Sequence, residues 1–171
     1  MSSSPSRGAP DNGTGKTPPA GFVEAVVVGA GSVGPGHAVL LVDTGQKRAV
    51  PIFIGGTEGR SIELRLEREK PPRPLTHDLL DSALRELGAR VHSARVVKLE
   101  DGVYHGTLVL VSRERTVELD SRASDAVAMA LGAGAPIFIA ARVLEQAGVP
   151  LDALADGGLP EPPPVRREIE L

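Results

Sequence analysis

The chain has 171 residues, of which 41% are hydrophobic and 24% charged, and its formal net charge is -3. This composition is typical of one globular domain. The negative net charge argues against a globally basic nucleic-acid binder, and the three Phe, one Tyr and no Trp argue against a base-stacking platform. Because cysteine is absent, disulfides, zinc–thiolate sites, iron–sulfur clusters and thiol nucleophiles are excluded, and a cytoplasmic location is expected.

Both ends of the chain differ in composition from its middle. Residues 1–20 are rich in Ser, Pro and Gly and contain too few apolar side chains to offset the entropy lost on ordering, so we predict a disordered tail. Residues 153–171 include three consecutive prolines and predict a flexible, Pro-rich tail. Residues 21–152 are expected to form one compact domain. No apolar run approaches the ~18 residues of a membrane span, and no apolar segment typical of a secretory signal is seen.

Three apolar, β-branched segments open the predicted domain. They predict strands over residues 22–28, 38–42 and 48–54, which could pair as an antiparallel meander. Residues 29–36 are expected to form a loop. Pro51 has no backbone N–H to donate to a sheet, so it should lie at a sheet edge or a bulge.

Two helices are predicted next. Good helix formers predict a helix over residues 56–69, which the prolines from Pro71 onward end. A second helix follows, with Thr76 as N-cap, Asp78 in the first turn and Gly88 just past the end. Its apolar positions have the spacing of a buried face: Leu79, Leu80, Ala83, Leu84 and Leu87.

The remaining segments alternate between strands and helices. Strands are predicted over residues 91–99, 104–111, 115–119 and 136–139, and helices over residues 123–131 and 141–147. Asp101-Gly102 is a hairpin signal between the first two of these strands. The whole pattern predicts an α+β fold with a mostly antiparallel sheet and about four helices.

Residues 29–34 match the pattern G-x-G-x-x-G, which binds pyrophosphate in dinucleotide-binding folds. That chemistry requires a helix directly after the glycines, because the helix N-terminus holds the phosphate. Here Pro35 and a predicted strand follow instead. We therefore predict a loop and no nucleotide cofactor.

One concentration of polar residues lies in the segment Arg73–Asp78, where prolines lead into a helix start. On a functional interpretation, His77 or Asp78 is a base or metal ligand and Arg73 holds an anion. On a structural interpretation, Thr76 caps the helix, Asp78 interacts with the helix dipole and His77 is solvated. The chemistry of these residues alone leaves both interpretations open.

A second concentration of polar residues runs from a strand end into a helix start, over Asp120–Asp125. Phosphodiester cleavage uses carboxylates to hold a divalent cation and a cation such as Arg to neutralise the phosphoryl charge. Asp120, Arg122 and Asp125 have these chemistries. The structural alternative is helix capping by Ser121, Ser124 and Asp125, with Asp120 and Arg122 as a surface pair.

Glu58 is a third candidate, near the start of the first predicted helix, where it could instead interact with the helix dipole. A run of basic residues follows it. This run is typical of a solvated face diluted by glutamates, although it could also track a phosphate backbone. Its members are Arg60, Arg65, Arg68, Lys70 and Arg73.

Several blocks, in order and at similar spacing over about residues 22–150, resemble the bifunctional nuclease family of bacteria and plants. They are PIFIG at 51–55 with Glu58, PPRPLTHDLL at 71–80, Asp101-Gly102, DSRASDA at 120–126 and PIFIA at 136–140 with Val143-Leu144. The block containing PRPLTHD is the specific one. The family's second motif usually reads D-A-R-P-S-D, so Ser121 and Ala123 depart from it and the rigid proline is lost.

The resemblance implies an oligomeric α+β protein that hydrolyses DNA and RNA. It implies catalytic roles for Asp120, Arg122, Asp125, His77 and Asp78, with Arg73, Ser124 and Glu58 binding substrate. In this arrangement Asp120 and Asp125 lie near a divalent ion such as Mg²⁺ or Mn²⁺, Arg122 and Arg73 bind phosphate, and His77 or a metal-bound water assists proton transfer.

A non-enzymatic oligomeric module that recognises a small anion or a protein partner is the alternative. The negative net charge and scarce aromatics favour it. A homo-oligomer is expected on either interpretation, because a small domain with several strands leaves sheet edges that self-association can cover.

Overall fold

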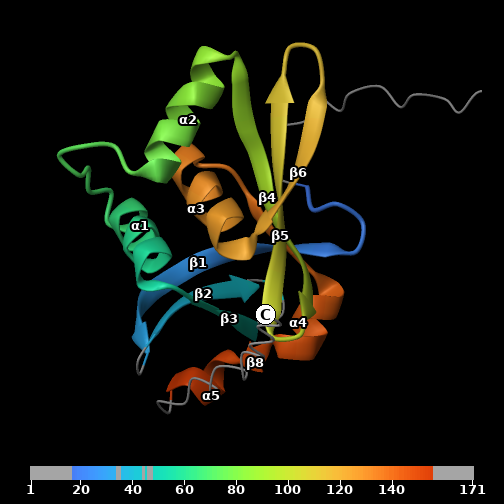
Figure 1. Cartoon of the computed structure of the whole chain (residues 1–171). Coiled ribbons are helices and arrows are strands. Elements are labelled where there is room, and N and C mark those ends of the chain that lie inside the picture. The colour runs from blue at the N-terminus through green and yellow to red at the C-terminus, as the bar shows by residue number, and fades with distance from the viewer. Residues whose placement is uncertain (1–16, 34–35, 44, 46–47, 156–171) are drawn as a thin grey trace, which may run out of the picture.

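The computed structural model describes residues 17–33, 36–43, 45 and 48–155. Within these residues the strands are β1 (Phe22–Val33), β2 (Gly36–Asp43), β3 (Arg48–Ile54), β4 (Ala89–Glu100), β5 (Val103–Ser112), β6 (Thr116–Arg122), β7 (Ile137–Ala140) and β8 (Val149–Pro150). They form one sheet in the order β6-β5-β4-β7-β1-β2-β3-β8 (Figure 1). Neighbouring strands are antiparallel except β4 and β7, so the mostly antiparallel α+β fold is confirmed.

The meander of the first three strands is confirmed, but the predicted loop over residues 29–36 is wrong. β1 continues through Val33, with a bulge after Val27, and β2 already begins at Gly36. Pairing with β2 supplies the hydrogen bonds that hold the glycines in an extended conformation, against their weak strand preference. Because β2 follows the glycine pattern where a dinucleotide fold needs a helix, the argument against a phosphate-binding loop stands.

Pro51 pairs with Leu40 of β2. On the other side of β3, the short strand β8 pairs with Arg48 and Ala49. Pro51 therefore lies beyond the reach of β8, as the missing N–H requires. The β4–β5 hairpin also follows its predicted turn, since Asp101 and Gly102 have positive φ angles of 49° and 78°.

Five helices accompany the sheet in the described part of the chain: α1 (Gly56–Leu66), α2 (Thr76–Glu86), α3 (Ala123–Ala133), α4 (Ala141–Ala147) and α5 (Leu151–Ala155). Four of them were predicted, whereas α5 was not, and the predicted domain boundary at residue 152 falls inside it. Residues 1–16 and 156–171, which make up most of the two predicted tails, lie outside the described residues.

Helix α3 is the centre of the core. Its residues from Ala123 to Ala130 are buried except for Asp125, and it packs against α1, α2, β4 and β5. Figure 1 shows it between α1 and α2 on one side and β4 and β5 on the other. The alanines of α3 let these elements approach closely. α3 thus fixes where the first turns of α1 and α2 lie.

The predicted buried face of α2 is wrong. No residue of α2 is buried, and Leu79, Leu80 and Leu87 are 66%, 44% and 81% exposed. Leu84 is the leucine that packs inward, against a small cluster that contains Met129 of α3. The amphipathic pattern correctly indicated which side of the helix is apolar. That side is nevertheless exposed, because α3 already occupies the space over β4 and β5.

Within the part of the chain that the structure describes, no helix has both the length and the apolar character needed to cross a bilayer.

Candidate active site

The starts of three helices meet at one pocket of about 200 Å³. α1 contributes Glu58 and Ser61, the first turn of α2 contributes His77, and the junction of β6 and α3 contributes Arg122 and Asp125. The two polar segments singled out in the sequence are therefore neighbours in space. They meet where the side chains of His77 and Asp125 touch.

The conformation of the junction between β6 and α3 follows from local interactions. Arg122 is the N-cap of α3 in an extended conformation, and Asp125 lies in the first helical turn, where the helix dipole favours a carboxylate. Gly106 of β5 faces this junction. A Cβ at Gly106 would lie 2.9 Å from the Cα of Ala123, so glycine is required for β5 to approach the helix start.

Asp125 is the hub of the site. Its Oδ2 accepts a hydrogen bond from Nε of Arg122 at 2.7 Å, and its Oδ1 accepts from the Arg122 terminal nitrogen at 3.1 Å. The Oδ1 atom also lies 3.0 Å from Nε2 of His77. Since a carboxylate only accepts, Nε2 carries the proton of this contact. The second terminal nitrogen of Arg122 contacts Glu58 at 2.7 Å, so the guanidinium bridges two carboxylates.

These contacts shift the ionisation of both partners. Burial alone would raise the pKa of Asp125, but the hydrogen bonds from Arg122 and His77, together with the positive charge of Arg122, outweigh it and lower the pKa. The hydrogen bond to Asp125 is the main cause that raises the pKa of Arg122; burial opposes it and Glu58 adds to it. Asp125 is therefore ionised and Arg122 cationic at neutral pH.

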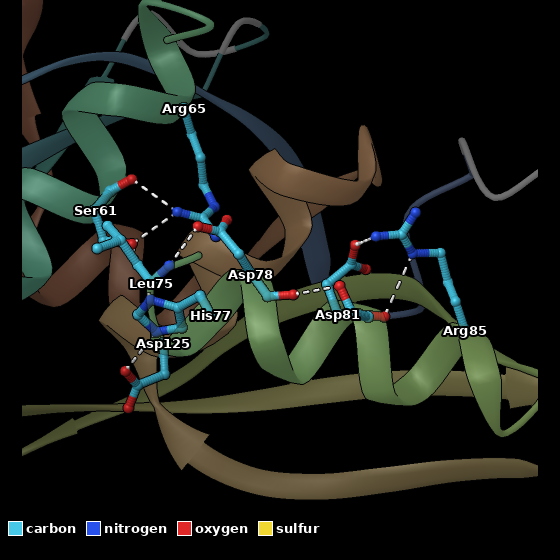
Figure 2. Close-up of polar contacts among 9 residues, drawn as sticks. Ser61, Arg65, Leu75, His77, Asp78, Asp81, Arg85 and Asp125 are labelled. Carbon is cyan, nitrogen blue, oxygen red and sulfur yellow. Dashed lines mark hydrogen bonds and ion pairs between the residues drawn. The ribbon is translucent and has the colours of Figure 1, made fainter. Parts of the chain in front are cut away.

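The other ring nitrogen of His77 is held from α1. Its Nδ1 lies 2.9 Å from Oγ of Ser61, and this Oγ accepts a hydrogen bond of 2.7 Å from Arg65 (Figure 2). Because Arg65 can only donate, the serine hydroxyl is free to donate its own proton to Nδ1. When the hydroxyl donates in this way, the ring proton of His77 lies on Nε2, the atom that faces Asp125.

Arg65 contradicts the expectation of a solvated basic face. Its side chain is only 9% exposed, and it also binds the Asp78 carboxylate at 2.7 Å. Ser61 and Arg65 lie one turn apart on the inner side of α1, which is why they reach His77 and Asp78 together. Sequence reasoning missed the roles of both residues, although their four-residue spacing beside the buried Ile62 and Leu64 was a usable signal.

Asp78 faces Arg65, away from the pocket. Its second oxygen accepts a hydrogen bond of 2.8 Å from the N–H of Leu75, so the cap of α2 is formed by Asp78 reaching back. The prediction that Thr76 is the N-cap is wrong, since Leu75 occupies that position and Thr76 is the first helical residue. Asp78 was expected to stabilise the start of α2 through the helix dipole; in the structure it does so through its hydrogen bond with the N–H of Leu75.

Three of the predicted site residues lie apart from this contact network. Arg73 is exposed in the segment between α1 and α2, and Asp120 is exposed on β6, opposite Thr107 of β5. Among the described residues neither side chain makes a hydrogen bond or ion pair, and Arg122 pairs with Asp125 and Glu58 instead of Asp120. Ser124 is buried in the first turn of α3. Roles for these three residues stay predictions.

A neighbouring pocket of about 350 Å³ shares Glu58 and Arg122 with the first. Phe53, Val103 and Tyr104 give it an apolar lining. Burial raises the pKa of Tyr104 to about 12, so its hydroxyl stays protonated at neutral pH. The Arg122–Glu58 ion pair therefore stands between a polar pocket and an apolar one.

The residues present do not fit the predicted divalent-metal site. No three His, Asp or Glu side chains come together as a ligand set among residues 17–33, 36–43, 45 and 48–155. Both oxygens of Asp125 already accept hydrogen bonds from nitrogen donors, and Asp120 contributes to no such set. No chemical step is therefore assigned to a metal, and a divalent-ion requirement stays a prediction.

The arrangement suits two chemical tasks. The imidazole of His77 can donate or accept a proton, and this side chain is still 13% exposed beside the pocket. Arg122 is 63% exposed, and its guanidinium has five N–H donors, of which three are used, so it can bind an anion as well. The fold and this site define an α+β domain with a histidine–carboxylate–guanidinium centre.

Comparison with known proteins gives the family. Residues 39–152 match the model of the bifunctional nuclease domain, and the chain belongs to this family. An uncharacterized protein that occurs in two strains of Mycobacterium tuberculosis is 38% identical over 111 residues, which is 65% of this chain and 66% of that protein. Bifunctional nuclease 1 of Oryza sativa and the bifunctional nuclease of Oryza minuta are 25% identical over 119 residues, which is 67% of this chain and 36% of theirs. The chain thus spans about two thirds of the mycobacterial relatives and about a third of the rice relatives.

Proposed function

We propose that the protein is a nuclease that hydrolyses phosphodiester bonds of DNA and RNA at the pocket formed by His77, Arg122 and Asp125. The observation that carries this proposal is the contact of His77 with Asp125 and of Asp125 with Arg122, in a chain of the bifunctional nuclease domain family. These groups combine a proton acceptor or donor with a cation for phosphate, which hydrolysis of a phosphodiester needs.

The proposed reaction is attack of a water oxygen on phosphorus with loss of the bridging ester oxygen. A phosphate oxygen binds the two free N–H groups of Arg122, which reduces the negative charge that opposes attack. His77 takes the proton of the attacking water and Asp125 stabilises the imidazolium that forms. The proton then passes to the departing oxygen. Because Nε2 carries the proton that faces Asp125, the nitrogen that accepts the proton of water is Nδ1, and its contact with Ser61 opens when water enters.

The decisive experiment compares purified variants on plasmid DNA and on single-stranded RNA. We expect Asp125→Asn and His77→Gln to lose at least ~100-fold in cleavage rate, the usual scale of a lost acid–base group. Asp152→Asn and His92→Gln, purified in the same way, are the matched controls and should cleave like the wild type. Equal cleavage by Asp125→Asn and the wild type, with folding verified by circular dichroism, disproves the site.

Asp120→Asn tests the resemblance-based role of Asp120 separately. Since Asp120 makes no contact with the cluster around Asp125 in the described residues, we expect a smaller loss than for Asp125→Asn. Titration with Mg²⁺, Mn²⁺ and a chelator in the same assay tests the divalent-ion prediction. Cleavage that persists in chelator would show that no such ion is needed.

A non-enzymatic module that recognises a small anion or a protein partner is the second candidate. It is favoured by the pairing of Arg122 with two carboxylates, which leaves this guanidinium without excess positive charge for a polyanion. Nuclease-free material that binds phosphate or a protein partner without cleaving either nucleic acid would select this function. The homo-oligomeric state and the cytoplasmic location belong to the proposal under both functions.

A further inference from the structure

The apolar pocket beside the candidate active site has no part in the proposed cleavage reaction. Separate segments of the chain enclose its volume of about 350 Å³: the end of β3, the start of α1, the turn into β5 and the start of α3. Small-molecule sites have volumes of roughly 300–1,000 Å³, so this pocket is large enough for a small ligand. Ile54 and Tyr104 form part of its wall and pack against the core, which fixes its shape.

Two hydroxyl groups line this pocket without a partner. Ser124 is only 8% exposed, and Tyr104 is partly buried. Among the residues that the structure describes, neither hydroxyl makes a hydrogen bond. Buried polar groups of folded proteins are nearly always hydrogen-bonded, so two unpaired hydroxyls in one pocket indicate a ligand with polar atoms on its edge.

Arg122 and Glu58 join this pocket to the candidate active site, because both residues line both pockets. A phosphate on the free N–H groups of Arg122 is therefore bound at the boundary between a polar and an apolar pocket. The ligand that fits is an anion joined to a group with apolar faces and a hydrogen-bonding edge. A nucleotide has this combination, whereas an alkyl phosphate would leave both hydroxyls unpaired.

We infer that the apolar pocket binds the base of the nucleotide whose phosphate contacts Arg122. The faces of the base pack against Ile54 and Tyr104, and its edge meets the hydroxyls of Tyr104 and Ser124. A hydroxyl can donate or accept, so these two groups suit the edge of any base and select no sequence. One base in a pocket does not need the row of exposed aromatics on which a platform stacks successive bases.

The inference rests on the proposed function, because it takes a nucleic acid as the substrate. It concerns binding of a base, however, which is measured without cleavage. Adenosine 5′-monophosphate and adenosine 3′-monophosphate contain no phosphodiester bond, so a nuclease does not hydrolyse them. Binding of these nucleotides and cleavage of a strand are separate measurements, and each can fail while the other succeeds.

The first test measures binding of small ligands to the full chain by isothermal titration calorimetry. The better bound of the two nucleotides should bind at least ~10-fold more tightly than ribose 5-phosphate, which has the sugar and the phosphate but no base. Butyl phosphate, in which an alkyl chain replaces the nucleoside, should bind more weakly than that nucleotide. Equal affinity for the nucleotides and ribose 5-phosphate overturns the inference, and so does butyl phosphate that binds as tightly as the nucleotides.

The second test removes the hydroxyls one at a time. Ser124→Ala and Tyr104→Phe should each weaken nucleotide binding about 3- to 10-fold, the scale of one hydrogen bond, and leave binding of ribose 5-phosphate unchanged. Ser121→Ala is the matched control and should bind the nucleotide like the wild type. The Ser121 hydroxyl also has no partner among the described residues, but it lines neither pocket. Unchanged nucleotide affinity in both Ser124→Ala and Tyr104→Phe, with folding verified by thermal unfolding, overturns the inference.

The third test uses single-stranded DNA that lacks the base at one position. The phosphates beside the abasic position should be cleaved at least ~10-fold more slowly than the same phosphates in the intact strand, because no base enters the pocket. Ser124→Ala should slow cleavage of the intact strand but not cleavage beside the abasic position. Equal cleavage of both strands by the wild type overturns the inference and leaves the nuclease function standing. A wild type that cleaves neither strand but binds nucleotides as expected disproves the nuclease function and supports the base pocket.

Discussion

His77 is the residue on which the site depends, because partners on two different helices hold its imidazole ring in place. Ser61 and Asp125 contact its two ring nitrogens, and Arg65 and Arg122 in turn orient those partners. A hydrogen-bonded series from Arg65 to Glu58 thus crosses the pocket. When Ser61 donates to Nδ1, the ring proton lies on Nε2 and faces the ionised carboxylate of Asp125.

Ser61 is predicted to be a positioning residue. Ser61→Ala removes the hydroxyl between Arg65 and His77 and leaves two buried polar groups with one partner fewer, so we expect a loss of about 1–3 kcal/mol in the free energy of unfolding. The pH dependence of cleavage should also move, which a purely structural role would not require. Ser82→Ala, on the exposed side of α2, is the control. Denaturant unfolding measures the stability of both variants, and equal stability would contradict the role assigned to Ser61.

The lowered pKa of Asp125 predicts that the stability of the fold depends on pH. Its pKa is lowered in the folded protein, below the unfolded value of about 3.9. The ionised form is then the one that stabilises the fold, so its contribution is complete above the unfolded pKa and is lost as the pH falls through the folded pKa. The difference in unfolding free energy between wild type and Asp125→Asn should therefore be constant near neutral pH and shrink in acid. A difference that grows in acid contradicts the assignment.

At the scale of elements, the approach of β5 to the start of α3 predicts an effect of Gly106→Ala. The added Cβ would meet backbone atoms of Arg122 and Ala123 that cannot rotate away, so we expect a loss of about 1–3 kcal/mol in stability and a displaced Arg122. Gly31→Ala on β1 has no atom within 4 Å of the added carbon and should be nearly neutral. Thermal unfolding distinguishes the two, and equal melting temperatures would refute the steric argument.

Elements whose limits are set by local chemistry could be predicted from the sequence. Gly88 ends α2 in a left-handed conformation, and Asp101-Gly102 forms the expected turn. Features decided by tertiary packing could not. The glycines of β1 are extended because β2 pairs with them, and Leu79 and Leu80 of α2 are exposed because α3 fills the core. Helix α5 lacks a long periodic pattern and so gave little signal.

At the scale of the whole molecule, the candidate site illustrates the same limit. His77 and Asp125 are 48 residues apart in sequence, and the β4–β5–β6 antiparallel run lies between them. Residue chemistry could select both segments as candidates, but only the fold shows that Ser61 and Arg65 join them while Arg73 and Asp120 do not contact the cluster. Selecting polar helix starts is a local inference, whereas pairing them requires the sheet order.

The distribution of the core predicts what the chain needs in order to fold. The described buried cluster extends from Ala25 to Leu144, within the predicted domain over residues 21–152. A chain shortened to residues 17–155 should therefore unfold at the same temperature as the full chain, within about 2 °C, because every side chain of the described core is kept. Differential scanning calorimetry of both chains measures this. A fall of several degrees would mean that residues 1–16 or 156–171 pack on the domain, and it would disprove the prediction that both tails are disordered.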